Sequence, residues 1–264
     1  MKNELGSRMK ENYENAYRIK LTRRIPVIIR VDGKAFHTLT RKCEKPFDEF
    51  FHNCMFSAME ALCREIQGVK CAYMQSDEIS VLLTDFDTIR TGAWFDYNLQ
   101  KLVSVSASIA SLAFWNVWQH EHGGGPMSIF DARAFNIPKD EVKNYFIWRQ
   151  LDWIRNSVSM LAQAHYSHRE LLNKNQADMH EMLHWKEVNW ADLDDAWKNG
   201  TFLFKDQTML HGAVIDSKWE RLDNLILTRD ERPVIGHVFE YLVWDRDKFS
   251  GEPIDVFSIE RKEQ

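Results

Sequence analysis

The chain has 264 residues, of which 44% are hydrophobic and 28% are charged, a composition typical of proteins that fold around a globular core. Its formal net charge of −5 argues against a protein that coats nucleic acid without specificity. Residues 1–45 nevertheless carry twelve Lys/Arg and only five Asp/Glu. This basic end could bind phosphate groups, or it could be an ordinary solvated surface.

Three further features bear on the location of the protein. Residues 1–18 are polar and charged, which is not typical of a secretory signal. The most apolar stretch, residues 101–118, is interrupted by serines and is too broken for a membrane span. The four cysteines contain no CxxC pair, which favours reduced thiols over a zinc knuckle or a disulfide scaffold. We therefore expect a cytoplasmic protein with no membrane partner.

The predicted elements begin with a strand and a helix. Residues 26–32 begin with a proline, are rich in β-branched side chains and end at an Asp-Gly turn signal, which predicts a buried strand. Apolar residues then recur at helical spacing over residues 46–66, with Pro46 suited to the first turn of a helix. Residues 69–75 and 79–85 read as the two strands of a hairpin with an acidic tip.

The pattern of residues 97–118 is ambiguous, since the alternation at its centre resembles a strand. The stretch is too long for one, so we predict a helix that lies close to the sheet. Residues 127–135 predict another strand, and a long helical region runs from 138 to about 198. Strand character returns afterwards, at residues 201–206, 234–245 and 255–259.

This order of elements predicts an α+β fold with an antiparallel sheet, helices on one face of it and a helical insertion. We divide the chain at residue 137. Residues 1–137 would form the catalytic core, and residues 138–264 a helical segment with returning strands that packs on the core as one compact unit.

Two aspartates are the candidate catalytic residues. Asp32 closes the first buried strand, and Asp77 lies at the tip of the hairpin. Carboxylates are the ligands that magnesium prefers for chemistry on polyphosphates, and Gly33 would let the backbone approach an ion or a phosphate. Asp-Gly and Ser-Asp are also common turn residues, so the pattern by itself leaves both interpretations open.

The sequence resembles the tRNA-histidine guanylyltransferase superfamily, whose members add nucleotides to the 5′ end of tRNA. The resemblance spans at least residues 6–157. It rests on several separate motifs in the family's order and spacing, namely GSRMK (6–10), RVDGKAFH (30–37), EKPFDE (44–49), YMQSDEISVLL (73–83), QKLVSVSASIAS (100–111), FDARAF (130–135) and WRQLDW (148–153).

The resemblance implies a palm-like core, similar to that of polymerases and nucleotide cyclases (a ferredoxin-like arrangement). It implies two magnesium ions held by the carboxylates of Asp32 and Asp77 and by the Gly33 carbonyl group, with ATP, GTP or another NTP as substrate. Basic side chains would stabilise the charge that develops on the phosphate. The residues that the resemblance places around the nucleotide are Asp32, Gly33, Lys34, Ala35, Phe36, His37, Lys45, Ser76, Asp77, Lys101, Arg133 and Asn156.

One departure from the family pattern affects the expected substrate. The enzymes that act on tRNA-histidine carry His-Ile-Asn-Asn after the WRQ motif, whereas this chain has Ile154, Arg155, Asn156 and Ser157. Only Asn156 matches, and Ile154 replaces the histidine. The sequence therefore resembles the branch that repairs 5′-truncated tRNAs by template-dependent 3′-to-5′ addition. Members of the family are commonly tetramers, so we expect a homotetramer that binds tRNA and NTPs.

Several alternatives stay open at this point. Within the family, the enzyme could add a single guanylate to tRNA-histidine. The same core could also serve a nucleotide cyclase or a non-catalytic RNA-binding homologue. A remote alternative is a zinc metalloprotease, because His180, Glu181 and His184 fit the HExxH motif. Its polar surroundings favour exposed histidines instead. Arg149, Trp153 and Asn156 would share one helical face, which could meet RNA or only pack.

Overall fold

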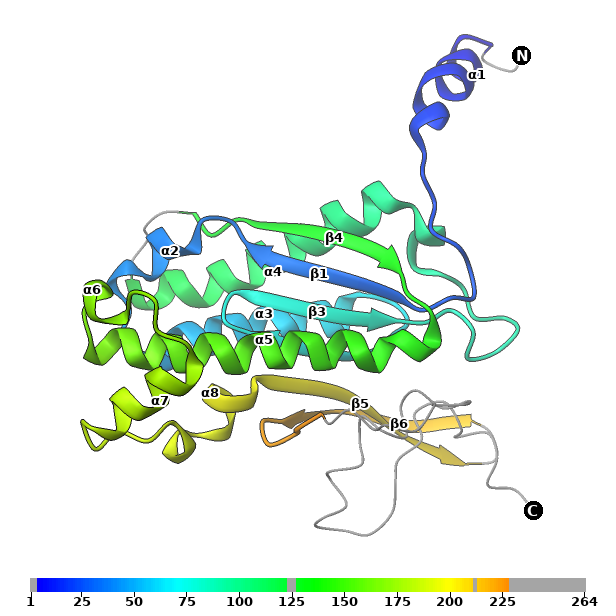
Figure 1. The fold of residues 1–264 in the computed structure, drawn as a ribbon. Coiled ribbons are helices and arrows are strands. Elements are labelled where there is room, and N and C mark those ends of the chain that lie inside the picture. The colour runs from blue at the N-terminus through cyan, green and yellow to red at the C-terminus, as the bar shows by residue number, and fades with distance from the viewer. Residues whose placement is uncertain (1–3, 123–126, 211–212, 228–264) are drawn as a thin grey trace.

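The computed structural model describes residues 4–122, 127–210 and 213–227. A six-stranded antiparallel sheet forms its centre, with the strand order β4-β1-β3-β2-β5-β6 (Figure 1). The predicted α+β class with an antiparallel sheet is therefore confirmed. The strands are β1 Val27–Gly33, β2 Val69–Gln75, β3 Glu78–Leu83, β4 Phe130–Asn136, β5 Thr201–Leu210 and β6 Ala213–Leu222.

Helices cover both faces of the sheet, and not one face as predicted. In Figure 1, α5 (Lys139–His165) lies in front of the strands, and α3 (Glu49–Glu65) and α4 (Leu99–His122) lie behind them. The reason lies in β1, where residues 27–29 and 31 are all buried. Because successive side chains of a strand point to opposite faces, an unbroken apolar run must be covered on both sides.

The helix α3 begins three residues later than predicted. Asp48 is its N-cap, and the Asp48 side chain accepts a hydrogen bond from the Phe51 N–H at 2.7 Å. A short carboxylate in this position satisfies one of the free N–H groups of the first turn. Pro46 therefore lies ahead of the helix and not in its first turn.

The ambiguous segment around residue 104 is helical, as predicted, and forms part of α4. Its serine hydroxyls donate to backbone carbonyls four residues earlier, including Ser104 to Gln100 at 2.7 Å and Ser108 to Ser104 at 2.8 Å. Back-bonding of this kind lets serine hydroxyls sit along a helix without unpaired hydrogen-bonding groups. The strand-like alternation is thus compatible with a long helix.

The predicted helical region after residue 138 divides into one long helix and several short ones. Capping boxes at Ser167 and Asn175 start new helices after α5, and Asn173 has a left-handed φ of 61°. These caps compete with continuation of a single helix. The remaining elements are α1 Glu4–Met9, α2 Phe36–Leu39, α6 His168–Leu171, α7 Gln176–His184, α8 Asp195–Asn199, a short π-helix Lys10–Glu14 and the 3₁₀ helices Asn15–Tyr17, Thr40–Lys42, Trp94–Tyr97 and Trp190–Asp192.

The sheet itself crosses the predicted boundary at residue 137. The strand expected at 201–206 is β5, which is longer than predicted and pairs with β2, so that Cys71 lies opposite Phe204. The following strand, β6, was not predicted. The strands expected at 234–245 and 255–259 lie outside the described residues. The second half of the chain thus extends the sheet of the first half.

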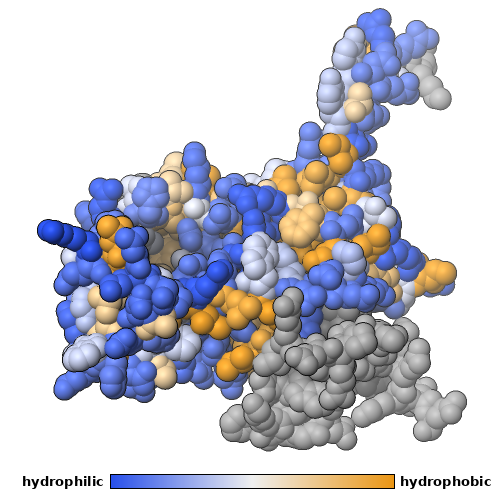
Figure 2. Space-filling model, in the orientation of Figure 1, coloured by the Kyte–Doolittle hydropathy of each residue, from blue (hydrophilic) through white to orange (hydrophobic). Residues whose placement is uncertain are grey.

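The first described residues form an arm that projects from the body, where α1 lies apart from the sheet and buries none of its residues (Figure 1). Most of the face seen in Figure 2 is hydrophilic, and apolar residues gather in separate patches, one of them where the arm joins the body. Within the ranges that the structure describes, no helix has the length and apolar character needed to cross a membrane.

Candidate active site

The turn between β2 and β3 holds Asp77 beside the end of β1. Asp32 lies opposite Glu78 in the β1–β3 register, and the Gly33 N–H donates to the Asp77 carbonyl oxygen at 3.0 Å. Ser76, in the same turn, has a left-handed φ of 48°. Residues other than glycine rarely adopt this conformation, and many of those that do lie at functional sites. The antiparallel pairing therefore brings together two acids that are 45 positions apart in the sequence.

Both aspartates line one cavity, here named the carboxylate cavity. It lies between the sheet and α5, and Arg149, Trp153 and Asn156 border it from that helix. The predicted common face of these three residues thus points to the candidate site. The lining consists of Asp32, Gln75, Ser76, Asp77, Glu78, Arg149, Trp153, Asn156, Ser159, Met160 and Gln163.

The surroundings of the two carboxylates make their ionisation less favourable than in water. Burial raises the pKa of Asp77, and the nearby Asp32 carboxylate raises it further. Burial also raises the pKa of Asp32, and the nearby Asp131 carboxylate raises it further. Three arginines lower the pKa of Asp32, and Arg133 has the largest effect of the three. Two adjacent acids that resist ionisation gain stability from a cation placed between them.

This donor set fits magnesium. The ligands are oxygen atoms, which the ion prefers, and magnesium retains water when few protein ligands are available. Among the described residues, no group of three or more His, Cys, Asp or Glu side chains could hold a metal. The coordination of an ion at Asp32 and Asp77 would therefore be completed by a backbone carbonyl such as that of Gly33, by water or by phosphate oxygens.

Gly33 is constrained by its neighbour Phe36. A Cβ atom added at Gly33 would lie 2.5 Å from the Phe36 ring. That ring is buried against Phe51, Phe114 and Phe130. The structure thus gives this glycine a packing role in addition to the expected close approach of an ion or phosphate. Of the predicted nucleotide-binding segment, the residues Lys34, Ala35 and His37 are exposed.

We predict that Gly33→Ala lowers the free energy of unfolding by about 1–3 kcal/mol, because the added methyl group overpacks the aromatic cluster. Chemical denaturation of the purified variant measures this change. Gly92→Ala is the matched control, since the nearest atom to its added Cβ would be the Gln67 amide nitrogen, 3.9 Å away. An equal loss in both variants would contradict the proposed clash.

The predicted basic residues do not all lie together. Arg133 is on β4, opposite Arg30 in the β1–β4 register and on the same face of the sheet as Asp32. Its guanidinium lies 3.7 Å from the Asp131 carboxylate and is largely exposed. Lys45 lines the neighbouring cavity, where its ammonium group donates to the Thr40 carbonyl at 3.0 Å.

The structure does not bring Lys101 to the carboxylates of its own chain. Lys101 lies in the first turn of α4, and its ammonium group is 5.1 Å from the centre of the Phe95 ring. The part of α4 that approaches the site is near Ser111, whose hydroxyl accepts a hydrogen bond from the Phe130 N–H. Ten residues of helix separate the two positions by about 15 Å.

Three charged residues around the site, Glu78, Arg149 and Arg30, were not among the predicted site residues, although Arg149 was predicted on the helical face that could meet RNA. Glu78 accepts two hydrogen bonds from Arg149, at 2.7 Å from Nε and 2.9 Å from Nη2, and Arg30 lies 3.9 Å from the same carboxylate. The alternation of the strand could have indicated Arg30, which is two positions before Asp32. The pair of Glu78 with Arg149 joins residues 71 positions apart and has no local sequence signal.

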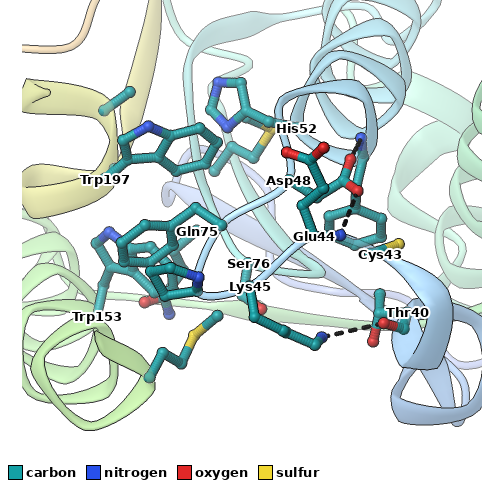
Figure 3. A pocket seen from close by; sticks show the side chains of 17 residues that line it. Thr40, Cys43, Glu44, Lys45, Asp48, His52, Gln75, Ser76, Trp153 and Trp197 are labelled. Atoms are coloured by element: carbon teal, nitrogen blue, oxygen red, sulfur yellow. Dashed lines mark hydrogen bonds between the residues drawn. The ribbon is translucent and has the colours of Figure 1, made fainter. Parts of the chain in front are cut away.

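A second, more apolar cavity opens beside the first and is drawn in Figure 3. Gln75, Ser76, Trp153 and Met160 line both cavities. The aromatic part of its wall includes Phe47 stacked on Trp197, with ring centres 5.0 Å apart. We name this space the aromatic cavity. At its border, the side-chain oxygen of Gln75 and the indole nitrogen of Trp153 are buried without a hydrogen-bond partner among the described residues.

The HExxH motif lies on the short helix α7, and none of its residues lines either cavity. His180, Glu181 and His184 are exposed, and His180 makes a T-shaped contact with Trp190. The described part of the chain contains no His, Cys, Asp or Glu cluster able to hold a metal, so the motif does not form a zinc site there. The metalloprotease alternative has no structural support.

Comparison with known proteins identifies the class of enzyme that combines this fold with this site. A bacterial tRNA(His) guanylyltransferase-like protein, solved in complex with ATP, is 44% identical, with a TM-score of 0.77 over 83% of this chain and 92% of that one. A structure of a bacterial protein of the same description in complex with GTP is 40% identical, with a TM-score of 0.69 over 83% and 91%. The chain is therefore a nucleotidyltransferase.

Its family follows from the sequence comparisons. The model of the tRNAHis guanylyltransferase family matches residues 6–138. The tRNA(His) guanylyltransferase of Debaryomyces hansenii is 30% identical over 200 residues, which are 68% of this chain and 73% of that protein. The chain belongs to the tRNAHis guanylyltransferase family, as its motifs predicted.

Proposed function

We propose that this protein adds nucleotides to the 5′ end of truncated tRNA in the 3′-to-5′ direction, directed by pairing with the opposite strand. The observation that carries the proposal is the pairing of β1 with β3, which sets Asp32 and Asp77 side by side in one cavity. The relatives solved with ATP and with GTP support an NTP as the substrate.

In the proposed reaction, the 3′-hydroxyl of the incoming NTP loses its proton and attacks the 5′-terminal phosphorus of the activated RNA end. The new phosphodiester bond forms as pyrophosphate leaves from a 5′-triphosphate, or as AMP leaves from an adenylylated 5′-monophosphate. Two magnesium ions, when bound, would activate this hydroxyl and neutralise charge on the triphosphate. Asp32, Asp77 and the Gly33 carbonyl would hold them. Arg133 and Lys45 would bind phosphate oxygens and stabilise the charge of the transition state.

The aromatic cavity is the proposed position of a nucleobase. It adjoins the carboxylate cavity along Gln75, Ser76 and Trp153, so a nucleotide could reach both. Nucleotide pockets combine apolar walls with a few polar groups, and the wall of Phe47 and Trp197 is of this kind. Asn156 lines the carboxylate cavity and would contact the nucleotide from α5.

Repair is proposed over guanylate addition to tRNA-histidine because of residue 154. The family enzymes that act on tRNA-histidine carry a histidine at this position, whereas this chain has an isoleucine. Ile154 is partly buried and is not among the residues that line the carboxylate cavity. Guanylate addition remains the second candidate, since the curated relatives include tRNA(His) guanylyltransferases.

One comparison separates the two candidates. The protein is incubated with magnesium, labelled NTPs and either an intact tRNA-histidine or a tRNA that lacks its first 5′ nucleotide. We predict growth of the truncated tRNA at its 5′ end by the nucleotide that pairs with the opposite strand. Growth of the intact tRNA by guanylate alone would favour the second candidate, and growth at the 3′ end would contradict both.

Two features remain part of this proposal. The sheet with catalytic acids at one strand end would correspond to a palm-like core. A homotetramer would allow Lys101 to contact RNA or phosphate at the site of another subunit, although it lies apart from the site of its own chain. Light scattering of the purified protein measures the assembly, and a monomer that adds nucleotides at full rate would contradict a shared site.

A further inference from the structure

An open shelf lies beside the carboxylate cavity, on the part of the sheet that α5 leaves uncovered. On this face Arg30 lies opposite Arg133, and Asp32 lies opposite Asp131. The side chains of Asp131 and Arg133 are each 56% exposed. We name Arg30, Arg133 and the neighbouring Asp32 the β1–β4 shelf. It is continuous with the candidate active site, because Asp32 belongs to both.

Trp148 borders this shelf from α5. Half of its surface is exposed, at 50%. The Arg149 guanidinium lies 4.5 Å from its ring centre, and that of Arg30 lies 6.0 Å from it. Tyr145 and Trp148 make a T-shaped contact with 5.8 Å between their ring centres. Because Glu78 fixes Arg149 with two hydrogen bonds, the ring is held in place while part of it faces solvent.

The two arginines of the shelf favour an anion between them, and each also lies near a carboxylate, Arg30 at 3.9 Å from Glu78 and Arg133 at 3.7 Å from Asp131. Like charges directly opposite on a sheet repel each other, and Arg30 and Arg133 are such a pair. A phosphate group between them would relieve the repulsion and form charge-assisted hydrogen bonds. Two residues of strand separate Arg30 from Asp32, which is about 7 Å. A phosphate bound there would lie next to the catalytic carboxylate.

The exposed ring favours a base. Nucleobases of single-stranded ends stack on aromatic side chains, and flanking guanidiniums add to this interaction. We propose that Trp148 is the platform on which the 5′-terminal base of the RNA stacks, while Arg30 and Arg133 bind the phosphate of that nucleotide. This inference rests on the proposed function and names the surface that holds the RNA end.

The test uses RNA binding without NTP, so that no catalysis is needed. A tRNA lacking its first nucleotide carries 2-aminopurine as its new 5′-terminal base, whose fluorescence falls when it stacks. We expect quenching by the unchanged protein. Trp148→Ala should abolish the quenching and weaken binding about tenfold, the effect of losing one base–aromatic stack. Trp148→Phe, which keeps a ring, should restore part of both.

Trp185→Ala is the matched control, since Trp185 is 78% exposed and follows α7. It should leave quenching and affinity unchanged. Arg133→Gln should lower the slope of log affinity against log salt by about one, as expected for one phosphate contact. Binding of ATP in the absence of RNA should be the same in Trp148→Ala and the unchanged protein, which shows that the fold and nucleotide site are intact.

The outcomes separate this inference from the proposed function. Equal quenching by the unchanged protein and Trp148→Ala, or an equal loss in Trp185→Ala, overturns the platform even if 5′ addition is observed. A protein that quenches through Trp148 but adds no nucleotide supports the platform and contradicts the proposed reaction. An unchanged salt slope in Arg133→Gln overturns the assignment of the phosphate to this arginine.

Discussion

Asp32→Asn and Asp77→Asn should each lower the rate of 5′ nucleotide addition by about a thousandfold or more. Ligands of a catalytic ion contribute several kcal/mol of transition-state stabilisation, and about 1.4 kcal/mol corresponds to a factor of ten. Asparagine keeps the shape of the side chain and removes its charge. Single-turnover extension of a truncated tRNA measures the rate, and calorimetric titration with magnesium should show loss of binding in parallel.

Although Asp77→Asn should lose activity, its folded state should be at least as stable as that of the unchanged protein. Burial raises the pKa of Asp77 in the folded protein, so its ionised form is less favourable there than in the unfolded chain. The resulting loss of stability sets in as the pH rises through the ordinary pKa of aspartate, and a neutral asparagine does not suffer it. Without magnesium, Asp77→Asn should therefore melt at the same temperature as the unchanged protein or higher.

Asp131→Asn is the control for this prediction. Asp131 lies opposite Asp32 in the β1–β4 register but is 56% exposed and is not a proposed ligand. It should retain activity within a few fold. A loss as large as that of Asp77→Asn would mean that the general negative potential of the site matters, and not coordination by the two named carboxylates.

Arg149→Ala should lower the free energy of unfolding by about 3 kcal/mol. The Arg149 side chain is 8% exposed and that of its partner Glu78 is 13% exposed, with two hydrogen bonds between them. Removal of Arg149 takes both hydrogen bonds from the buried Glu78 carboxylate and leaves it only the more distant Arg30, at 3.9 Å, and breaking a buried pair in this way costs more than the pair contributes. Denaturant unfolding followed by circular dichroism measures the change.

The same helix provides the control for this second prediction. Arg155 also pairs with Asp152, at 2.8 Å, but its side chain is 60% exposed, so Arg155→Ala should change stability by no more than about 0.5 kcal/mol. The double variant Glu78→Leu with Arg149→Met removes both charges of the pair and should recover part of the loss, since Arg30 and Asp152 each lose one partner. A double variant as unstable as Arg149→Ala would contradict the explanation by an unpaired charge.

The strands and helices could be predicted where the spacing of apolar residues is compatible with only one type of secondary structure. The strand at 27–33 and the helix at 49–65 follow from apolar spacing, and the aspartate at each strand end is visible in the same stretch. The helix boundaries were less exact because caps decide them. Asp48 starts α3 through a hydrogen bond that Pro46 does not indicate.

Helical character beyond residue 166 was overestimated for a related reason. Capping boxes at Ser167 and Asn175 end one helix and start others, although the residues between them suit a helix. A capping side chain acts over three residues, whereas the apolar periodicity is averaged over many. The local hydrogen bonds therefore decided the break.

The sequence by itself identified the two candidate aspartates, the strand that ends at Asp32, the hairpin around Asp77 and the family to which the chain belongs, since motif and alternation are local properties of the chain. Only the tertiary structure decided that Asp32 lies beside Asp77, that Arg149 neutralises Glu78 and that Lys101 lies at the far end of α4. These contacts join residues far apart in the chain. They depend on strand register and helix packing. The free energy of the whole core decides both, so neither can be recognised from the residue at a single position of the sequence.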